Sequence, residues 1–421
     1  MKLKKHSKQT PAKKTKTKSN GHAASDPTAL SDDFAKELIK DLNREAGEQI
    51  AFNLGTDDAP TVIKRWISTG SRQLNSILSN NLIGGLPEGR IVEIQGPTSS
   101  GKSHIAYEVA KATQKLGGIV VYMDTENATN LDNLSQLGID VHNRFVFVQT
   151  VCTEEIFAVA ERAITKARAM TQDVPVTIIW DSLAASSPKA ELEGDYDQNS
   201  IGLQARVLGK GMRKIVNVIG NQNVLFLLIN QQRKNIGVMF GDDTTTPGGM
   251  AVPYASSIRI RITSTGQSHI KDKKGEVIGI KVKAKTIKNK VAKPFRTVEF
   301  RIIFGQGIVE DEEIFDLFRE YCSETKTDGL VLPNGRKVNL SGTSAWKNFL
   351  VTDSDGVVLH DIKFNKSQFK DKVLDVPEFS VYMDALLEAA LVHKPGQTFE
   401  PDIDVESFTD IQAASMLAEG T

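Results

Sequence analysis

A glycine-rich loop, "GPTSSGKS" at residues 96–103, is the clearest chemical signature in the chain. It matches the spacing GxxxxGK[ST] in full, and it lies between a strand-like apolar segment and a segment with helical periodicity. Glycines let backbone N–H groups turn toward phosphate oxygens, and the start of the helix adds its positive dipole end. The pattern therefore predicts a site for a nucleoside triphosphate with Mg²⁺.

All the residues of this loop are expected to contact the nucleotide: Gly96, Pro97, Thr98, Ser99, Ser100, Gly101, Lys102 and Ser103. Lys102 can reach the β- and γ-phosphates, and Ser103 can bind Mg²⁺. Asp181 ends the apolar run "VTIIWD" and is predicted to be the second acid of the Mg²⁺ site. A carboxylate that merely caps the end of a strand is the ordinary alternative, and the phosphate loop favours the metal role.

A carboxylate that activates the attacking water is expected just beyond the strand-like run 119–124, in "MDTEN". The carboxyl ends of parallel strands meet at one edge of a sheet, beside the phosphate loop. Asp124 and Glu126 both lie at that position. Their spacing alone does not choose between them.

The elements that must position these residues alternate along the chain. Near-continuous apolar runs at 90–95, 119–124, 176–181 and 224–230 are typical of strands buried on both faces of a parallel sheet. Between the first two, Ile105, Val109, Ala112 and Leu116 recur on one face of a predicted helix that ends at Gly117-Gly118.

Beyond Ser256 the pattern changes to alternation, at 258–262, 278–287 and 298–304, which predicts antiparallel strands at one side of the sheet. The fold class is therefore α/β: a P-loop ATPase core with a mostly parallel sheet plus antiparallel strands. An amphipathic helix near Phe34, Leu38 and Leu42 precedes this core, and a small C-terminal α/β domain follows it.

Five segments are expected along the chain: a disordered basic tail (1–28), an N-terminal helix and linker for subunit packing (29–60), the core (61–308), the small C-terminal domain (309–395) and an acidic tail (396–421). The formal net charge is zero, but the head is rich in lysine and no Lys or Arg follows Lys394. Such ends are typical of solvated tails, and they can also modulate the binding of a polyanion.

Composition excludes several classes of protein. No apolar run is long enough for a transmembrane helix, and the basic N-terminus lacks the apolar region of a secretory signal. Cys152 and Cys322 are far apart and lack metal-ligand spacing, which argues against a zinc site or a disulfide framework. We therefore expect a protein of a reducing, cytoplasmic compartment that has no membrane partner.

Several long segments resemble the bacterial RecA family of strand-exchange recombinases. These segments run in order from about Lys64 to Gly307: "ISTGSRQLNSIL", "GGLPEGRIVEIQGPTSSGKS", "SPKAELEGD", "IGLQARVLGKGMRKI", "INQQRKNIGVMFG", "TTTPGGMA" and "TIKNKVAKPF". The resemblance is weaker over the N-terminal helix and the last hundred or so residues. The divergence and the long basic head suggest a phage-encoded or distant member, active in a bacterial cytoplasm or an infected host cell.

The resemblance implies a RecA-like ATPase core, with ATP and Mg²⁺ as cofactors. It implies a helical filament of the protein on single-stranded DNA, which pairs that strand with homologous double-stranded DNA. Glu126 matches the family's water-activating residue and is preferred over Asp124. Gln231 resembles its γ-phosphate sensor, whereas from the sequence alone a polar strand end would be favoured.

Lys288 and Lys290 in "KNK" resemble the family's two lysines that reach the ATP of a neighbouring subunit. A positive charge supplied in trans stabilises transition-state charge and makes hydrolysis depend on assembly. Lys281, Lys283 and Lys285 alternate just upstream. That alternation alone favours the solvated face of a basic strand.

Two glycine-containing segments, 191–200 and 235–249, resemble the DNA loops of the family. After the first, Arg206, Lys210 and Arg213 share one helical face that suits phosphates. The expected DNA contacts are Arg206, Arg213, Arg233, Met239, Phe240, Thr244, Thr245, Thr246, Gly248 and Gly249. The alternative for Lys210 is a solvated helix face. The alternative for Met239 and Phe240 is packing within the loop.

The chain also departs from the family pattern. Asn133 stands where the family has an adenine-stacking Tyr, and Asn235 replaces a lysine of the second loop. The interface segment reads "VPYAS" at 252–256, apparently one residue shorter than in the family, with Pro253 inside it. The first loop carries the acidic "DYDQN", and the C-terminal domain is too diverged for residues to be matched.

Two other classes of function fit a P-loop core. One is a ring helicase, and the other is an ATP-gated DNA-binding scaffold without strand exchange. The segment "GVMFGDDTTTPGG" and the KNK pair favour the recombinase over the ring helicase. The set of Lys102, Glu126 and Asp181 argues against lost hydrolysis.

Overall fold

A computed structural model describes residues 32–55, 59, 61–171, 173–195, 202–234, 244–263, 269–323, 330–332, 334–342 and 346–392. The chain divides into two units, Met1–Val62 and Ile63–Thr421. In the first, helix α1 (Asp32–Ala46) includes the predicted amphipathic segment. Its apolar side chains are solvent-exposed, with Phe34 at 52%, Leu38 at 46% and Leu42 at 40%.

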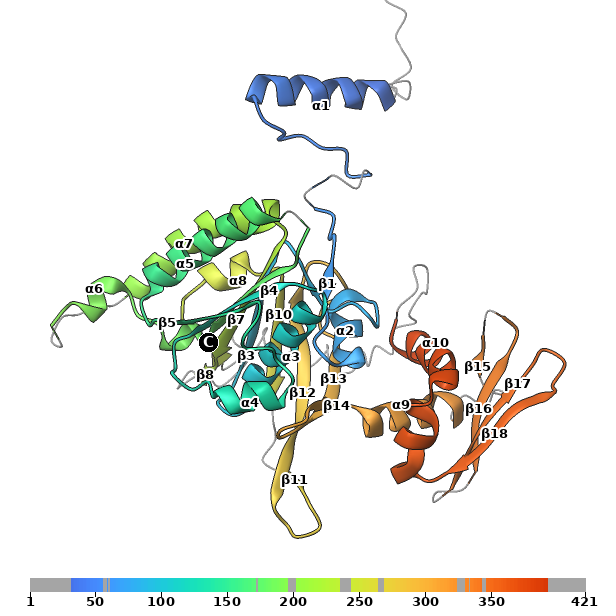
Figure 1. Cartoon of the computed structure of the whole chain (residues 1–421). Helices are drawn as coiled ribbons and strands as arrows, with labels where there is room; N and C mark the ends of the chain where they lie inside the picture. The colour runs from blue at the N-terminus through green and yellow to red at the C-terminus, as the bar shows by residue number, and fades with distance from the viewer. Residues whose placement is uncertain are drawn as a thin grey trace, which may run out of the picture. The chain divides into compact units, whose positions relative to one another are not determined.

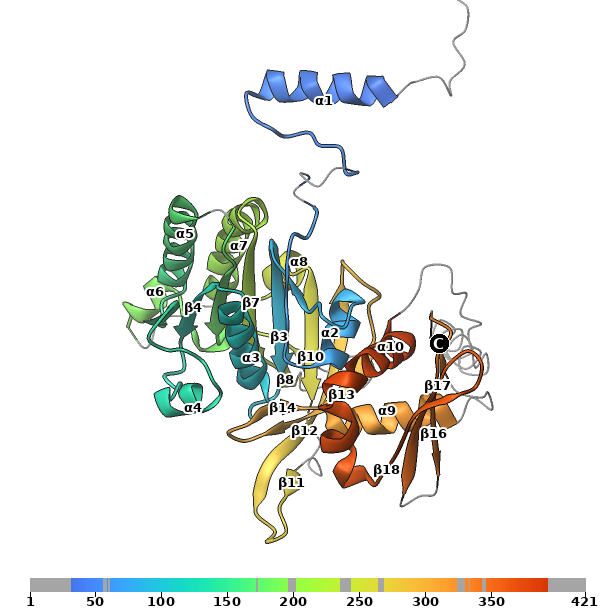
Figure 2. The same cartoon turned by 45° about the vertical axis from the view of Figure 1, so that its right-hand side comes forward.

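Within the described part of the second unit, the largest sheet has ten strands (Figures 1 and 2). Along the sheet, β14, β13, β12, β10, β3, β7, β6, β4 and β5 are neighbours in that order, and β11 pairs with β12. Their bounds are β3 (Arg90–Gly96), β4 (Ile119–Asp124), β5 (Phe145–Gln149), β6 (Val176–Asp181), β7 (Val224–Gln231), β10 (Ile258–Thr263), β11 (His269–Lys271), β12 (Val277–Asn289), β13 (Thr297–Ile303) and β14 (Gly307–Val309).

Strand pairing divides the sheet at β10. From β10 to β5 all neighbours are parallel, whereas β12, β13, β14 and β11 pair antiparallel. The antiparallel side was predicted from the alternating pattern. Strand β10 belongs to both sides, because it runs parallel to β3 and antiparallel to β12. The predicted fold class is confirmed.

Helices cover both faces of this sheet (Figure 2). On one face α2 (Arg72–Ser79), α3 (Lys102–Lys115) and α4 (Leu131–Gln136) contribute to a core that includes Ile94 and Phe300. On the other, α5 (Thr153–Met170), α7 (Leu203–Asn221) and α8 (Ala251–Ala255) build a core around Trp180 and Phe226. Since both faces are buried, the parallel strands carry apolar side chains on both sides.

The end of helix α3 corrects one expectation. Ile105 and Val109 are buried as predicted, but Leu116 is 50% exposed. Leu116 caps the helix and Gly117 follows with φ +76°. Because the chain turns there, Leu116 leaves the helical face that the spacing assigned to it.

Short elements connect the main ones. They are β1 (Trp66–Ile67), β2 (Leu86–Pro87), the 3-10 helix Leu183–Ala185, α6 (Lys189–Leu192), β8 (Arg233–Lys234) and β9 (Thr244–Thr245). Strands β1 and β2 pair with each other, as do β8 and β9. None of the described helices is long and apolar enough to cross a membrane.

A third core forms in the C-terminal region, where α9 (Asp311–Ser323) and α10 (Ser380–Leu391) flank an antiparallel sheet. The described part of that sheet contains β15 (Leu330–Val331), β16 (Lys337–Gly342), β17 (Lys347–Thr352) and β18 (Val358–Phe364). Phe318, Phe349 and Phe369 are fully buried among them. The segment from β18 to α10 forms short helical turns at Lys366–Gln368, Lys370–Leu374 and Pro377–Phe379.

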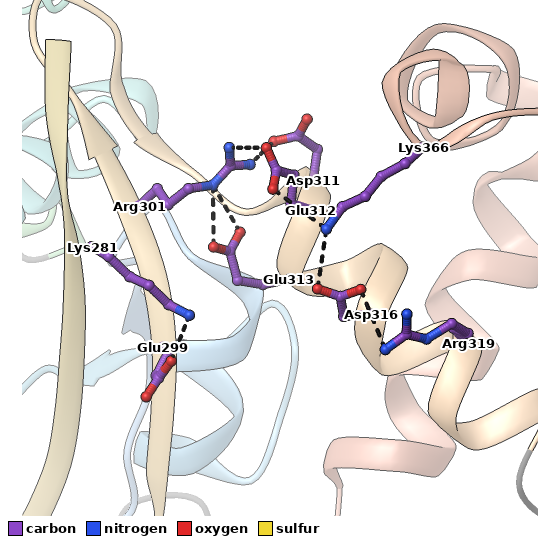
Figure 3. A network of polar contacts seen from close by, with 9 residues as sticks. All are labelled: Lys281, Glu299, Arg301, Asp311, Glu312, Glu313, Asp316, Arg319 and Lys366. Atoms are coloured by element: carbon purple, nitrogen blue, oxygen red, sulfur yellow. Dashed lines mark hydrogen bonds and ion pairs between the residues drawn. The ribbon is translucent and has the colours of Figure 1, made fainter. Parts of the chain in front are cut away.

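Charged side chains tie α9 to strand β13 (Figure 3). Arg301 of β13 pairs with three consecutive acids at the start of α9: Asp311 at 2.6 Å, Glu312 at 2.6 Å and Glu313 at 3.1 Å. Lys366 pairs with Glu312 at 3.4 Å and Asp316 at 3.2 Å. Arg301 therefore lies at the junction between the large sheet and the C-terminal core.

Candidate nucleotide and DNA sites

Neighbouring strands lie close to both glycines of the phosphate loop. A Cβ on Gly96 would lie 2.3 Å from the carbonyl oxygen of Ile262, and one on Gly101 would lie 2.5 Å from Cδ1 of Ile302. Gly101 also has φ +93°, a conformation that side chains rarely adopt. The predicted glycines are therefore required by the loop itself, which provides the backbone cradle that a triphosphate fits.

Lys102 lies in this loop with its ammonium folded back. Its Nζ donates to the carbonyl oxygen of Pro97 at 2.6 Å, and the hydroxyl of Ser100 donates to the same oxygen at 2.8 Å. Burial lowers the pKa of Lys102, while the charges of Asp181 and Glu126 oppose that shift. A buried ammonium held by one carbonyl can exchange that bond for an anionic phosphate oxygen.

Asp181 lies at the end of β6 in a buried, hydrogen-bonded position. The hydroxyl of Tyr122 donates to its Oδ2 at 2.7 Å. Burial raises the pKa of Asp181, and hydrogen bonds from Tyr122 and Ser103 oppose this. Ser103 and Asp181 are thus within hydrogen-bonding reach of each other, as a pair that holds one Mg²⁺ shell requires.

The two candidates for water activation have different surroundings. Asp124 is 2% exposed and accepts from the backbone N–H groups of Glu126 and Thr129, both at 2.9 Å. Both of its oxygens therefore hold the turn after β4. Glu126 is exposed, so its carboxylate is the one accessible to water.

The side chain of Glu126 is held by residues from two other strand ends. Its Oε1 accepts from Nε2 of Gln231, the last residue of β7, at 2.8 Å. The same oxygen accepts a short hydrogen bond from the hydroxyl of Ser182, which follows β6. Adjacent strands β4, β6 and β7 thus bring three residues together that are far apart in the sequence.

Lys288 and Lys290 lie at the end of β12, on the other side of the sheet. Nζ of Lys288 donates to the carbonyl oxygen of Pro253 at 2.6 Å, so α8 rests against it. Lys290 is exposed, and its side chain makes no hydrogen bond or ion pair within the described part of the chain. Between them, Asn289 caps α2 by donating to Ile77 and Leu78.

The predicted DNA residues gather beside α7. Arg206, Lys210 and Arg213 are all exposed on that helix. A Cβ on Gly249 would lie 3.2 Å from Cβ of Ala205, so the end of the second loop meets the start of α7. Arg233 and Thr245 are paired across β8 and β9, at the base of the same loop.

The remaining DNA candidates lie around this base or beyond what the structure describes. Thr244 belongs to β9, and Thr246, Gly248 and Gly249 follow it. Gly248 is buried, with φ +98°. Met239 and Phe240 lie outside the described residues, as does Asn235.

A cationic cavity beside the second loop was missed by sequence reasoning. It encloses about 530 Å³, and its lining includes Thr245, Thr246, Arg259, Arg261 and Lys285. The alternation in "IRIRI" carried the signal, because it places both arginines on the face opposite the buried isoleucines. The buried Glu93 of β3 accepts from both Arg259 and Asn230, which links Arg259 to the residue just before Gln231.

Asn133, which stands at the position of the family's adenine-stacking Tyr, belongs to helix α4. Its backbone N–H donates to Oδ1 of Asn130 at 3.1 Å, so Asn133 lies in the first turn of α4. An exposed aromatic ring lies elsewhere near the phosphate loop: Phe304 is 50% exposed and its ring centroid is 6.3 Å from that of His104.

Comparison with known proteins agrees with this arrangement. The RecA N-terminal domain family matches residues 34–309. The RecA protein of Bacteroides thetaiotaomicron is 40% identical over 282 residues, which cover 67% of this chain and 81% of that protein. The RecA protein of Staphylococcus carnosus is 37% identical over 314 residues, which cover 74% of this chain and 84% of that protein.

The RecA protein of Pseudomonas fluorescens is also 37% identical, over 333 residues that cover 79% of this chain and 89% of that protein. The family match over residues 34–309 includes the phosphate loop, the strand ends around Glu126, and Lys288 and Lys290. The chain therefore belongs to the RecA family of recombinases, whose members are DNA-dependent ATPases.

Proposed function

We propose that the chain assembles as a helical filament on single-stranded DNA and pairs that strand with homologous double-stranded DNA. As a RecA family member it is an ATP-dependent recombinase of DNA recombination and repair, and it uses ATP and Mg²⁺. The observation that carries the proposal is the contact of Gln231 with Glu126. It joins the nucleotide edge to the strand that leads into the second DNA loop.

Within one subunit, residues at three strand ends bind the nucleotide. The loop 96–103 holds the phosphates through its backbone N–H groups and Lys102. Ser103 and Asp181 hold Mg²⁺, which supplies charge neutralisation at the phosphates when it is bound. Glu126 accepts the proton of the attacking water, because it is the accessible carboxylate of the two candidates.

Gln231 acts as the sensor of nucleotide state. Its amide can exchange Glu126 for a γ-phosphate oxygen, and Arg233 of the loop base lies only two residues further on. A small movement at Gln231 therefore changes the base of the second loop. An order–disorder change of a loop that follows a γ-phosphate contact is an established kind of switch.

Lys288 and Lys290 complete the ATP site of a neighbouring subunit. Among the described residues, Lys288 donates to backbone carbonyls, and Lys290 makes no side-chain hydrogen bond or ion pair. Both ammonium groups are therefore available to an external anion. Such a site works only in an assembly, which makes hydrolysis report filament formation. The exposed apolar face of α1 supports the same arrangement through subunit packing.

DNA is held without base reading by the exposed face of α7 and by the base of the second loop. Arg206, Arg213 and Arg233 contact phosphates, while Thr244 to Thr246 and the glycine pair donate from short side chains and backbone N–H groups. Met239 and Phe240 are proposed to lie beside bases. The C-terminal domain is proposed to capture duplex DNA.

We propose the following roles for the five segments of the chain. Residues 1–28 and 396–421 are tails, 29–60 serve subunit packing, 61–308 form the core and 309–395 form the C-terminal domain. The site of action is the bacterial cytoplasm, or an infected host cell if the chain is phage-encoded.

Strand exchange with homologous and heterologous duplex tests this function directly. We expect joint molecules with the homologous duplex only, in the presence of ATP and Mg²⁺. Electron microscopy with long single-stranded DNA and a slowly hydrolysed ATP analogue should show helical filaments. Closed rings would instead support a ring helicase, and filaments without strand exchange would support an ATP-gated scaffold.

A further inference from the structure

A buried serine lies directly beside Glu126. Ser182 is 1% exposed, and its hydroxyl donates to Oε1 of Glu126. We propose that Ser182 is a positioning residue for ATP hydrolysis, which fixes the orientation of the Glu126 carboxylate. The proposal rests on the function above, in which Glu126 accepts a proton from the attacking water.

A pair of hydrogen bonds joins the backbone of Ser182 to the hydroxyl of Thr125, the residue after β4. The hydroxyl of Thr125 donates to the carbonyl oxygen of Ser182 at 2.6 Å, and it accepts from the backbone N–H of Ser182 at 2.8 Å. The backbone N–H of Thr125 donates to the carbonyl oxygen of Asp181 at 2.9 Å. Since Thr125 is itself 3% exposed, the hydroxyl of Ser182 starts from a fixed position.

The pattern of bonds at Glu126 separates its two oxygens. Ser182 and Gln231 both donate to Oε1, and within the described residues Oε2 has no hydrogen-bond partner. A carboxylate anchored through one oxygen presents the other in a defined direction. That geometry suits a general base, which must lie within hydrogen-bond reach of the proton that it takes.

Ser182 becomes the more important anchor once nucleotide binds. Gln231 is half-buried at the end of β7 and, as the proposed sensor, gives up Glu126 for the γ-phosphate. Ser182 is buried and its backbone is hydrogen-bonded to Thr125, so its bond to Oε1 of Glu126 does not depend on nucleotide. Without that bond the exposed side chain of Glu126 would rotate freely while the water is being activated.

Steady-state ATP hydrolysis by the full-length protein on long single-stranded DNA tests the proposal. Ser182→Ala should lower kcat about tenfold with KM for ATP unchanged, the loss expected for one hydrogen bond to a charged group. Ser182→Thr keeps the hydroxyl and should restore most of the rate. Ser186→Ala is the matched control: this buried serine donates to the carbonyl oxygen of Leu183, and its loss should leave kcat unchanged.

A double-mutant cycle then asks whether Ser182 acts through Glu126. In single-turnover experiments, Glu126→Gln should lower hydrolysis strongly, and adding Ser182→Ala should cause no further loss. A further tenfold loss in the Glu126→Gln background would overturn the proposal, because Ser182 would then act independently. Unchanged kcat in Ser182→Ala, or no recovery in Ser182→Thr, would overturn it as well.

The proposed function fails in a different way. Full hydrolysis by Glu126→Gln would remove Glu126 from water activation, whatever Ser182 does. The affinity for a fluorescent ATP analogue, measured for each variant, reports whether the nucleotide site is intact.

Discussion

The two sides of strand β10 differ in where their charged residues find partners. On the parallel side, Glu126 and Asp181 are already held by Gln231, Ser182 and Tyr122 of the same chain. On the antiparallel side, the hydrogen bonds of the Lys288 ammonium to described residues go to backbone carbonyls, and Lys290 is exposed. The contacts within one chain therefore already orient the proposed catalytic carboxylates, whereas the proposed partner of the two lysines is the ATP of another subunit.

This difference shows how assembly can control an enzyme without a moving lid. A residue with partners inside its chain is oriented before any ligand arrives, which is what electrostatic preorganisation requires. A residue whose partner is on another subunit contributes only when the subunits meet. The four predictions below test these two classes of residue in turn.

The largest effect is expected at the phosphate loop. Lys102→Ala removes the ammonium that exchanges the carbonyl of Pro97 for phosphate, so hydrolysis should fall by a hundredfold or more, on the order of the loss of one transition-state donor. The loss should be the same with and without DNA. Phosphate release measured with and without DNA checks this. A loss confined to the DNA-bound state would show that Lys102 acts only in the assembled protein.

Lys288→Ala and Lys290→Ala should remove DNA-stimulated hydrolysis, by a factor on the order of a hundred, while the subunit still binds ATP. The reason is that a charge supplied in trans stabilises the transition state only in the filament. Lys166→Ala, on the exposed surface of α5, is the control for loss of a lysine charge. Equal DNA-stimulated rates for wild type and both lysine variants would contradict the in-trans role.

Arg301 tests a fully partnered charge outside the catalytic edge (Figure 3). Arg301→Ala removes the cation shared by three acids of α9, of which Glu312 keeps its pair with Lys366. It should lower the free energy of unfolding by about 1–2 kcal/mol, because Arg301 is only 14% exposed but its partners are partly solvated. Hydrolysis should persist. The control, Arg319→Ala, breaks an exposed ion pair with Asp316 and should lower the free energy of unfolding by less than about 0.5 kcal/mol. Urea titrations of both variants and the wild type measure these differences.

The smallest effect is expected from Glu310, a half-buried carboxyl that accepts from Ser71 and from the backbone N–H of Arg72. Burial raises its pKa above the ordinary 4.5, against the effect of those hydrogen bonds. The folded chain then holds this proton more tightly than the unfolded chain, so its contribution to stability is present below pH 4.5 and is lost as the pH rises through the raised pKa.

Glu310→Gln should remove that pH dependence. The melting temperature of the wild type, measured relative to this variant, should therefore decline as the pH rises above 4.5. A relative melting temperature that rises with pH would show that the hydrogen bonds outweigh burial.

Much of the core could be predicted from the sequence because its signals are local. The loop 96–103 has a fixed spacing, and strands such as β6 are continuous apolar runs bounded by polar residues. Helix α3 was predicted by its period, but its last turn was not, since the exposure of Leu116 depends on where the chain turns at Gly117. The antiparallel side followed from alternation along β12.

What could not be predicted depends on contacts between distant segments. Asp124 and Glu126 are two residues apart, and only the backbone bonds to Asp124 and the strand ends around Glu126 distinguish them. The role of Ser182 required the register of β4 against β6, which pairs Asp124 with Asp181. The cavity beside Arg259 required two segments, at residues 245–250 and 285–295, to meet.

Strand β10 has a mechanical consequence for an assembly of these chains. It is hydrogen-bonded to β3, which ends in the phosphate loop, and to β12, which ends in the lysines; Arg259 pairs with Glu93 on one side and Lys288 on the other. Two strand spacings, about 10 Å, therefore separate Lys288 of β12 from Glu93 of β3, three residues before Gly96. In the filament proposed above, this rigid sheet would connect two neighbouring nucleotide sites directly, without a flexible linker between them.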